Sequence, residues 1–391
     1  MERTKKQKAI NFIESYLYKI DNNEFSLKKT VEDFQKIKRK FEPFEFLFDY
    51  EVARIYHYDL EDFEKGKKFY FEALKGSQND DEIKGEIYFG IGCLFRDLKE
   101  YEESNKYYNL CLDLYSKKKD KHSIQYSESS LRELGSIYED EGDYSKAIEY
   151  YKKAHELSEG THFSGISLYY LASLYSNELD DEKTALYYAE KAEKLLKEEE
   201  YIIGNYHLLA HIHHMLGNYQ KAIQICESQI RKYKNTEYVS DFYTMLGKVY
   251  CFKKEEEKGI ANFNLALKNL KSNDPEYNEA YIFLNSWIAM AEEALQNYKK
   301  SLDIISSILE KYKTVEENLI SPISIKGRIF KKTGYFYDGY YFLNKGLRNY
   351  EKSRFFDKNE YYYIEALELK KEFYNKLPII NRWIEKIKNL M

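Results

Sequence analysis

The sequence predicts an all-α protein built as a solenoid of about eight helix-turn-helix repeats. Only 4 Pro and 17 Gly occur in 391 residues, and because these residues interrupt helices most strongly, their scarcity favours helices throughout. Charged residues make up 32% of the chain and aromatic residues 17%. Small residues also recur at intervals of 37 to 43 residues, at Ala53, Gly92, Gly135, Ala172, Ala210, Gly247, Ala289 and Gly327.

The chain divides into three expected segments, taken in order. Residues 1–43 form an N-terminal helical segment, with helices at about 7–20 and 27–41, the second opened by Ser26 as its N-cap. Residues 44–350 hold the repeats. Residues 351–391 contain a helix at 359–376 and then a capping helix, "LPIINRWIEKIKNLM", whose apolar stripe can close the open end of the solenoid.

One repeat shows the underlying pattern most clearly, "LRELGSIYEDEGDYSKAIEYYKKAHEL" from Leu131. It resembles a tetratricopeptide (TPR) repeat, and this resemblance implies a right-handed superhelical TPR solenoid. Gly135 lies where the two helices of the repeat, A and B, are expected to cross closely, and Tyr151 fills the space around that contact. Gly142 and Asp143 are expected to form the turn between the helices.

The charge distribution and the cysteine content limit the classes of function that the protein can have. The net charge is −5, but residues 1–40 carry +5, residues 323–391 carry +7 and residues 41–322 carry −17. An acidic body argues against direct nucleic-acid binding and favours a peptide ligand with positive charge. The four cysteines form no CxxC pair and no apolar run approaches 18 residues, so we expect a reduced, cytoplasmic protein with no membrane segment.

Four of the eight histidines lie in "HLLAHIHHM", residues 207–215. His207, His211 and His214 are spaced i, i+4, i+7 and share one helix face. Such a set can bind zinc, or take part in acid–base chemistry. However, there is no HExxH motif, no nearby cysteine and no carboxylate between Leu208 and Gln220. We therefore expect these histidines to line a polar surface, with no metal, no cofactor and no enzymatic activity.

The inner faces of the A helices form the expected binding groove. Hydroxyls, amides, imidazoles and mixed charges suit an extended peptide, whose backbone needs donors and acceptors along its length; an ordinary solvated face is the alternative. The lysine–asparagine set with which co-chaperone TPRs hold a carboxylate is absent. The expected peptide-binding residues are His57, Arg96, Arg132, Ser136, Glu139, Tyr169, Ser173, Asn177, His207, His211, His214, Asp241, Lys248 and Ser286.

The N-terminal part carries a more particular resemblance. "SLKKTVEDFQKIKRKF", "FLFDYEVARIYH", "DFEKGKKFYFEALK" and the repeat from Gly85 to Tyr115 resemble the Rap family, peptide-pheromone receptors of Gram-positive bacteria. The resemblance implies a short signalling peptide in the groove and a regulatory protein bound through the N-terminal helices or the groove. It leaves a homodimer open.

Some Rap proteins are phosphatases that use a glutamine in the N-terminal bundle. In this chain the corresponding position falls within "PFEF", Pro43–Phe46, and the nearest glutamine is Gln35. We therefore expect a regulator that only binds. The alternative function is a constitutive TPR scaffold that assembles a protein complex without a peptide switch.

Overall fold

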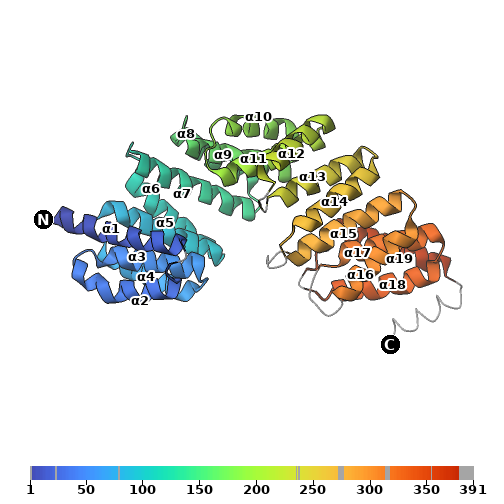
Figure 1. Cartoon of the computed structure of the whole chain (residues 1–391), viewed down its shortest axis with the longest axis horizontal. Coiled ribbons are helices and arrows are strands. Elements are labelled where there is room, and N and C mark those ends of the chain that lie inside the picture. The colour runs from blue at the N-terminus through green and yellow to red at the C-terminus, as the bar shows by residue number, and fades with distance from the viewer. Residues whose placement is uncertain are drawn as a thin grey trace. The chain divides into compact units, whose positions relative to one another are not determined.

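The computed structural model shows helices as the only regular secondary structure in the residues that it describes (Figure 1). The all-α fold class is therefore confirmed. The predicted capping helix, with Ile380, Trp383, Ile384 and Ile387, lies outside the described residues. The described residues are 2–22, 24–77, 80–234, 236, 238–271, 277–312, 318–353 and 355–377.

The N-terminal segment begins with helices α1 (Glu2–Asp21) and α2 (Leu27–Ile37), followed by the short 3₁₀ helix η1 (Lys38–Phe41). The predicted cap at the start of α2 is confirmed, because the Ser26 side chain accepts a hydrogen bond from the backbone N–H of Lys29. This bond satisfies one of the amide groups that a helix start leaves without an intrahelical partner.

Within the described residues eight helical hairpins follow, as the recurring small residues predicted, and then helix α19 (Tyr361–Lys376). In each hairpin the first helix is A and the second is B. The A helix of the first hairpin, α3, continues into one π-helical turn, η2. The hairpins are α3 (Glu45–Arg54) with η2 (Ile55–Asp59) and α4 (Phe63–Gly76); α5 (Asp81–Asp97) and α6 (Tyr101–Tyr115); α7 (Lys121–Asp140) and α8 (Tyr144–Leu157); α9 (His162–Asn177) and α10 (Glu182–Glu193); α11 (Glu199–Met215) and α12 (Tyr219–Tyr233); α13 (Val239–Phe252) and α14 (Glu256–Asn269); α15 (Tyr277–Ala294) and α16 (Tyr298–Lys311); α17 (Ile320–Thr333) and α18 (Phe336–Tyr350).

The turn inside each hairpin contains one residue with a left-handed backbone. Glycine takes this position in three turns, with φ of 76° at Gly142, 74° at Gly217 and 80° at Gly334. Glycine adopts such a φ without the steric cost that a Cβ imposes. In the other five turns the residue is Glu61, Lys99, Asp180, Lys254 or Gln296. The same turn geometry therefore persists where the sequence gives no glycine signal.

Helix crossings inside the hairpins follow the predicted small-residue register. A Cβ on Gly92 would lie 2.6 Å from the Tyr108 ring, and a Cβ on Gly135 would lie 2.7 Å from the Tyr151 ring. Both tyrosine side chains are fully buried. The small residue on helix A thus lets the aromatic ring of helix B pack directly against the backbone.

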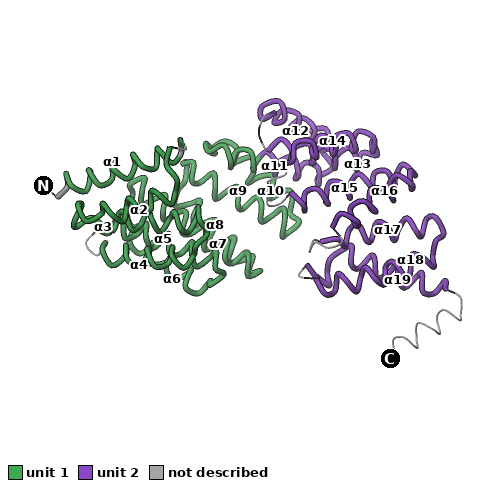
Figure 2. The backbone as a smooth tube through the Cα atoms, turned by 60° about the horizontal axis from the view of Figure 1, so that its bottom comes forward, with its two compact units in different colours: residues 1–205 green, residues 206–391 purple. Residues whose placement is uncertain are grey.

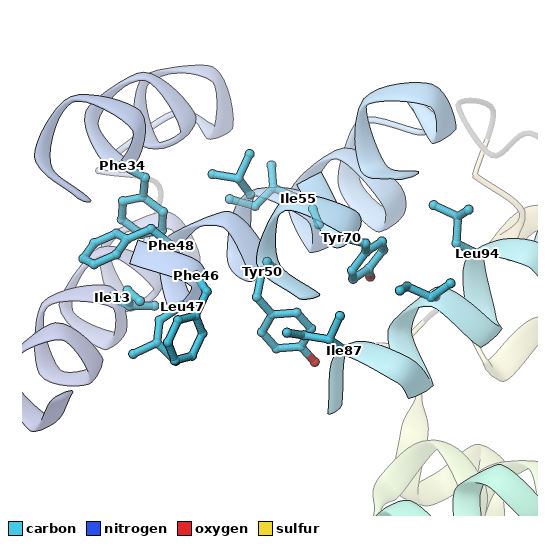
Figure 3. Packing of buried hydrophobic residues seen from close by; sticks show 14 of the residues in the cluster. Ile13, Phe34, Phe46, Leu47, Phe48, Tyr50, Ile55, Tyr70, Ile87 and Leu94 are labelled. Atoms are coloured by element: carbon cyan, nitrogen blue, oxygen red, sulfur yellow. The ribbon is translucent and has the colours of Figure 1, made fainter. Parts of the chain in front are cut away.

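The chain forms two compact units, residues 1–205 and residues 206–391 (Figure 2). The boundary between them falls within α11. In the first unit, side chains of the N-terminal helices join the core of the first hairpins, where Phe34, Phe48, Tyr50, Tyr70 and Ile87 are buried (Figure 3). The division into segments 1–43, 44–350 and 351–391 stays a prediction.

Candidate functional site

The A helices form a continuous layer within each unit. In the first unit α3 contacts α5, α5 contacts α7, and α7 contacts α9; in the second unit α13 contacts α15, and α15 contacts α17. Side chains on the free face of this layer are therefore neighbours across successive hairpins. All the residues that the sequence predicted for peptide binding belong to A helices or, for His57, to the π-helical turn η2.

Two predicted residues of the first unit are buried, which corrects their expected place on the binding surface. His57 is 2% exposed, and its ring nitrogens lie 3.3 Å from the Tyr70 hydroxyl and 2.9 Å from Asp97. Arg132 is 8% exposed, and its guanidinium pairs with Glu128 and Glu133. His57 thus contacts α4 and α5, and Arg132 pairs with carboxylates of its own helix, because an isolated buried polar group would be costly.

Arg96, Ser136 and Glu139 are partly buried on the same layer. Arg96 pairs with Glu133 and with Asp97. Glu139 accepts a hydrogen bond of 2.7 Å from the Tyr151 hydroxyl, and burial raises the pKa of its carboxyl group. The polar groups of α5 and α7 are therefore largely engaged with one another.

Helix α9 presents more accessible groups. Asn177 is exposed, and its amide donates a 3.0 Å hydrogen bond to the Ser173 hydroxyl. Tyr169 is partly buried and packs edge-to-face against Tyr170 and Tyr201. These three predicted residues lie at the surface of the first unit as a mixed polar and aromatic patch.

In the second unit the structure gathers the predicted histidines beside Lys248. Burial, together with Lys248 and His211, lowers the pKa of His207 and of His214 to about 4. The pKa of His211 is lowered by burial and by Lys248. Burial also lowers the pKa of Lys248 itself. The three imidazoles are therefore neutral at pH 7, next to one ammonium group.

Aromatic side chains surround this basic group, and the sequence prediction missed them. The Lys248 ammonium lies 4.9 Å from the Phe283 ring centroid and 5.9 Å from that of Trp287. The His214 ring packs edge-on against Phe252, with centroids 4.6 Å apart. Phe252 is 53% exposed and Phe283 42% exposed. We call this set the histidine–lysine surface; it consists of His207, His211, His214, Lys248, Phe252, Phe283 and Trp287.

A pocket of about 720 Å³ adjoins this surface and shares Phe283 with it. Its lining is mostly apolar, with a carboxylate on α15 and another next to the start of α19. The volume falls in the range of small-molecule and side-chain sites. The lining residues are Glu279, Ala280, Ile282, Phe283, Asn318, Ile320, Ser321, Phe355, Glu360 and Tyr362.

The remaining two predicted residues of the second unit differ in exposure. Asp241 is exposed on α13. Ser286 is 3% exposed, and its hydroxyl oxygen lies 3.3 Å from that of Ser321. Its expected place on the surface is therefore corrected, because α17 covers it. His214, at 7% exposure, is likewise largely covered and lies at the edge of the surface.

Two further predictions concern chemistry. Within the described part of the chain, no group of three or more His, Cys, Asp or Glu side chains is arranged to hold a metal ion. Gln35, the glutamine nearest the stretch where the resemblance to Rap proteins places their phosphatase glutamine, donates a 3.1 Å hydrogen bond to Asp49, which also pairs with Lys38.

No helix of the described residues is long and apolar enough to cross a membrane.

These features define the class of protein: an array of helical hairpins whose A-helix layer carries polar and aromatic side chains. Family models of the tetratricopeptide repeat match residues 85–118, 126–198 and 206–237. These three stretches therefore contain tetratricopeptide repeats, and this type of repeat is a protein-interaction module.

Solved structures are similar in fold. A tetratricopeptide repeat protein from Parabacteroides merdae is 14% identical, with a TM-score of 0.50 over 72% of this chain and 98% of that chain. A signal transduction ATPase with numerous domains and a tetratricopeptide repeat sensor, from Pyrococcus horikoshii, is 18% identical, with a TM-score of 0.52 over 93% of this chain and 52% of that chain. No curated protein matches the sequence.

Proposed function

We propose that this protein is an intracellular receptor for a short signalling peptide and that it controls a partner regulatory protein. The observation that carries the proposal is the exposed aromatic and basic surface on α11, α13 and α15, with a pocket of about 720 Å³ beside it. Recognition of an extended segment requires an aromatic anchor beside a pocket, together with a few polar groups in fixed positions.

The exposure of Phe283 and Phe252 supports this proposal. Both aromatic rings lie on A helices of adjacent hairpins, and both remain about half exposed. Burying such rings against a ligand removes apolar area from water at roughly 25 cal/mol per Å². Lys248 and the histidines next to them supply polar contacts that fix the orientation of a bound backbone.

The resemblance of the N-terminal helices to those of Rap proteins supports the second half of the proposal. In that arrangement a peptide in the groove alters how the N-terminal helices engage a regulatory protein. Residues 1–40, within the N-terminal segment, carry an excess of basic residues, which suits a partner with an acidic surface.

A constitutive scaffold is the second candidate function. The observation in its favour is the presence of exposed apolar side chains on the B helices of each unit, Phe71 and Tyr187 in the first unit and Leu265 and Tyr337 in the second. These side chains lie away from the A-helix layer. A folded partner bound there would need no peptide and no switch.

Mass spectrometry of peptides extracted from the full-length protein, purified from its native host, tests the proposal. We expect a short peptide from the wild-type chain and about tenfold less from Phe283→Ala, because the exposed ring contributes to the anchor. Tyr187→Ala, at a comparably exposed ring on α10, is the matched control and should retain the peptide. Recovery of a folded protein and no peptide, unchanged by Phe283→Ala, would favour the scaffold.

A further inference from the structure

We propose that a small pocket of the first unit binds an uncharged, planar aromatic molecule. This site goes beyond the proposed function, because it lies in the first unit and takes a ligand other than a peptide. The pocket has a volume of about 260 Å³, and its lining comes from α3, η2, α4, α5 and α7. The lining residues are Tyr50, Arg54, Tyr58, Tyr70, Phe89, Gly90, Gln125, Tyr126 and Ser129.

Aromatic rings form much of the pocket wall. The ring centroids of Tyr50 and Tyr70 lie 6.1 Å apart (Figure 3), and the Phe89 ring packs edge-on against Tyr126 at 5.5 Å. Between these rings the buried Gly90 brings bare backbone to the pocket, and a Cβ there would lie 2.7 Å from the Tyr70 ring. Aromatic rings contact one another in offset-stacked or edge-on arrangements, so this wall suits a flat aromatic ligand.

The π-helical turn η2 supplies a further ring, Tyr58. This turn is the one π-helical segment among the residues that the structure describes, and in it the Leu60 N–H donates a 3.0 Å hydrogen bond to the Ile55 carbonyl. Tyr58 is 52% exposed and stacks at 4.0 Å on His57, which is buried. Single π-helical turns occur frequently at functional sites. Here the turn presents a half-exposed ring to the pocket and supports it from below with a buried imidazole.

The charged groups next to the pocket already have partners. Arg54 pairs with Glu51 at 3.1 Å. Glu86 accepts a 3.1 Å hydrogen bond from the Tyr126 hydroxyl and lies 3.5 Å from His122, and burial raises the pKa of its carboxyl group to about 7. A charged ligand would therefore lose its hydration without gaining an unpaired counter-ion, and that loss is costly. An uncharged ligand avoids this cost.

Helix α7 supplies the polar part of the pocket. Gln125 is exposed, and its amide group has both donors and an acceptor. The Ser129 hydroxyl lies 3.4 Å from the Glu128 carboxylate and can also accept a hydrogen bond from a ligand. Pockets for drug-sized ligands usually measure about 300–1,000 Å³, so this smaller pocket limits its ligand to about one or two rings. The preferred ligand therefore has an amide or hydroxyl group at the edge of a flat ring.

Four small molecules of nearly equal size test this site on the full-length protein. Benzamide is aromatic and uncharged, cyclohexanecarboxamide is uncharged but not aromatic, and benzoate and benzamidine carry opposite charges. Their dissociation constants are measured at pH 7.5 by ligand-observed NMR titration. We expect saturable binding of benzamide and about tenfold weaker binding of the other three, because they lack the ring contacts or must lose the hydration of a charge.

The wild-type protein alone can contradict the proposal. Absence of saturable benzamide binding would overturn it, and so would equal affinity for benzamide and cyclohexanecarboxamide. Tighter binding of benzoate or benzamidine than of benzamide would show that the site selects a charge and would also overturn it. None of these results bears on peptide binding by the second unit, so the two proposals fail independently.

Substitutions show whether benzamide occupies this pocket. Tyr58→Ala removes a ring from the wall and Ser129→Phe fills the pocket, so each should weaken benzamide binding about tenfold, whereas Tyr58→Phe keeps the ring and should bind normally. Tyr187→Ala, at a ring on α10 that is also 52% exposed, is the matched control. Thermal melting checks that each variant is folded. Loss of benzamide binding in Phe283→Ala, with normal binding in Tyr58→Ala and Ser129→Phe, would place the ligand in the pocket of the second unit and contradict the proposal.

Discussion

At the scale of single residues, His207 and His214 make stability depend on pH. Burial lowers both pKa values to about 4 from 6.5. Between these values the unfolded chain binds protons that the folded chain excludes. Because the unfolded state binds more protons, the free energy of unfolding falls as the pH is lowered from about 6.5 to 4.

We therefore expect the urea midpoint to fall on acidification, and to fall less in His207→Gln/His214→Gln. The difference between the two proteins should be about 1–3 kcal/mol between pH 7 and pH 5, since one pKa unit corresponds to about 1.4 kcal/mol. Urea titrations at pH 7, 6 and 5 measure it. Identical pH dependence in both proteins would show that the two imidazoles titrate normally in the folded state.

The same histidines carry a prediction about metal. They lie among aromatic rings and Lys248, and an adjacent ammonium group disfavours a bound cation. The purified protein should hold far less than one zinc ion per chain, and EDTA should leave its melting temperature unchanged. A tightly held metal ion that is lost in His207→Ala/His211→Ala would contradict this prediction.

At the scale of helices, the crossing of A and B depends on the absence of a side chain at one position. The Tyr151 ring is fully buried, and its hydroxyl donates a hydrogen bond to Glu139, so the ring has little freedom to move. A Cβ on Gly135 would lie 2.7 Å from this ring. Gly135→Ala should lower the free energy of unfolding by about 1–3 kcal/mol, as overpacked cores do.

Gly204→Ala is the matched control for this prediction. Its Cβ would meet the outer end of the Tyr169 side chain, with the hydroxyl oxygen nearest at 3.1 Å, and this end of the side chain can move. Replacing a helical glycine by alanine also gains about 0.5–1 kcal/mol, so the net change should stay within about 1 kcal/mol. Chemical denaturation of both variants measures the two changes in the free energy of unfolding. Equal decreases in the two variants would mean that the helix crossing at Gly135 is not tight.

The N-terminal helices carry a prediction about catalysis. Gln35 on α2 is hydrogen-bonded to Asp49, and Phe46, within the "PFEF" stretch, is 5% exposed. The resemblance to Rap proteins implies that their phosphatase glutamine would fall within this stretch, which contains no glutamine. The protein should not accelerate loss of phosphate from a phosphorylated response regulator that it binds, in a time course at equimolar protein. Acceleration that a substitution among residues 42–49 abolishes would contradict this.

The helices and their register could be predicted from the sequence because they depend on local periodicity. Gly92 and Gly135 identify their crossings, and Gly142 identifies a turn, from residue type alone. The turns at Lys99 and Gln296 have the same left-handed backbone, but lysine and glutamine do not indicate such a turn in a sequence. Their positions follow only from the spacing of the neighbouring repeats.

The site could be predicted only in part. The stripe of His207, His211 and His214 follows from helical spacing, and the structure places it next to Lys248. The burial of Arg132 and Ser286 depends on partners in adjacent hairpins, Tyr170 and Ser321, which the local pattern does not reveal. Phe283 and Trp287 are spaced i, i+4 like core residues, so their exposure and contact with Lys248 could not be read from spacing.

At the scale of the whole chain, net charge is a poor guide to the ligand. The acidic middle of the sequence favoured a peptide with positive charge, but that count combines all faces of the helices. The histidine–lysine surface instead has one ammonium group and no carboxylate among the groups that set its histidine pKa values. Local charge decides what binds there, because charges on other faces are screened beyond about 10 Å.

Hydrogen–deuterium exchange of the full-length protein, with and without a pool of random octapeptides, tests the central claim most directly. A peptide on the A-helix layer should slow exchange in α11, α13 and α15, since the hydrogen bonds of these helices open less often when a ligand bridges them. Helices α12, α14 and α16 should change little. Slower exchange confined to the B helices, or no change at any peptide concentration, would contradict the claim that the inner layer of this repeat protein is a peptide receptor.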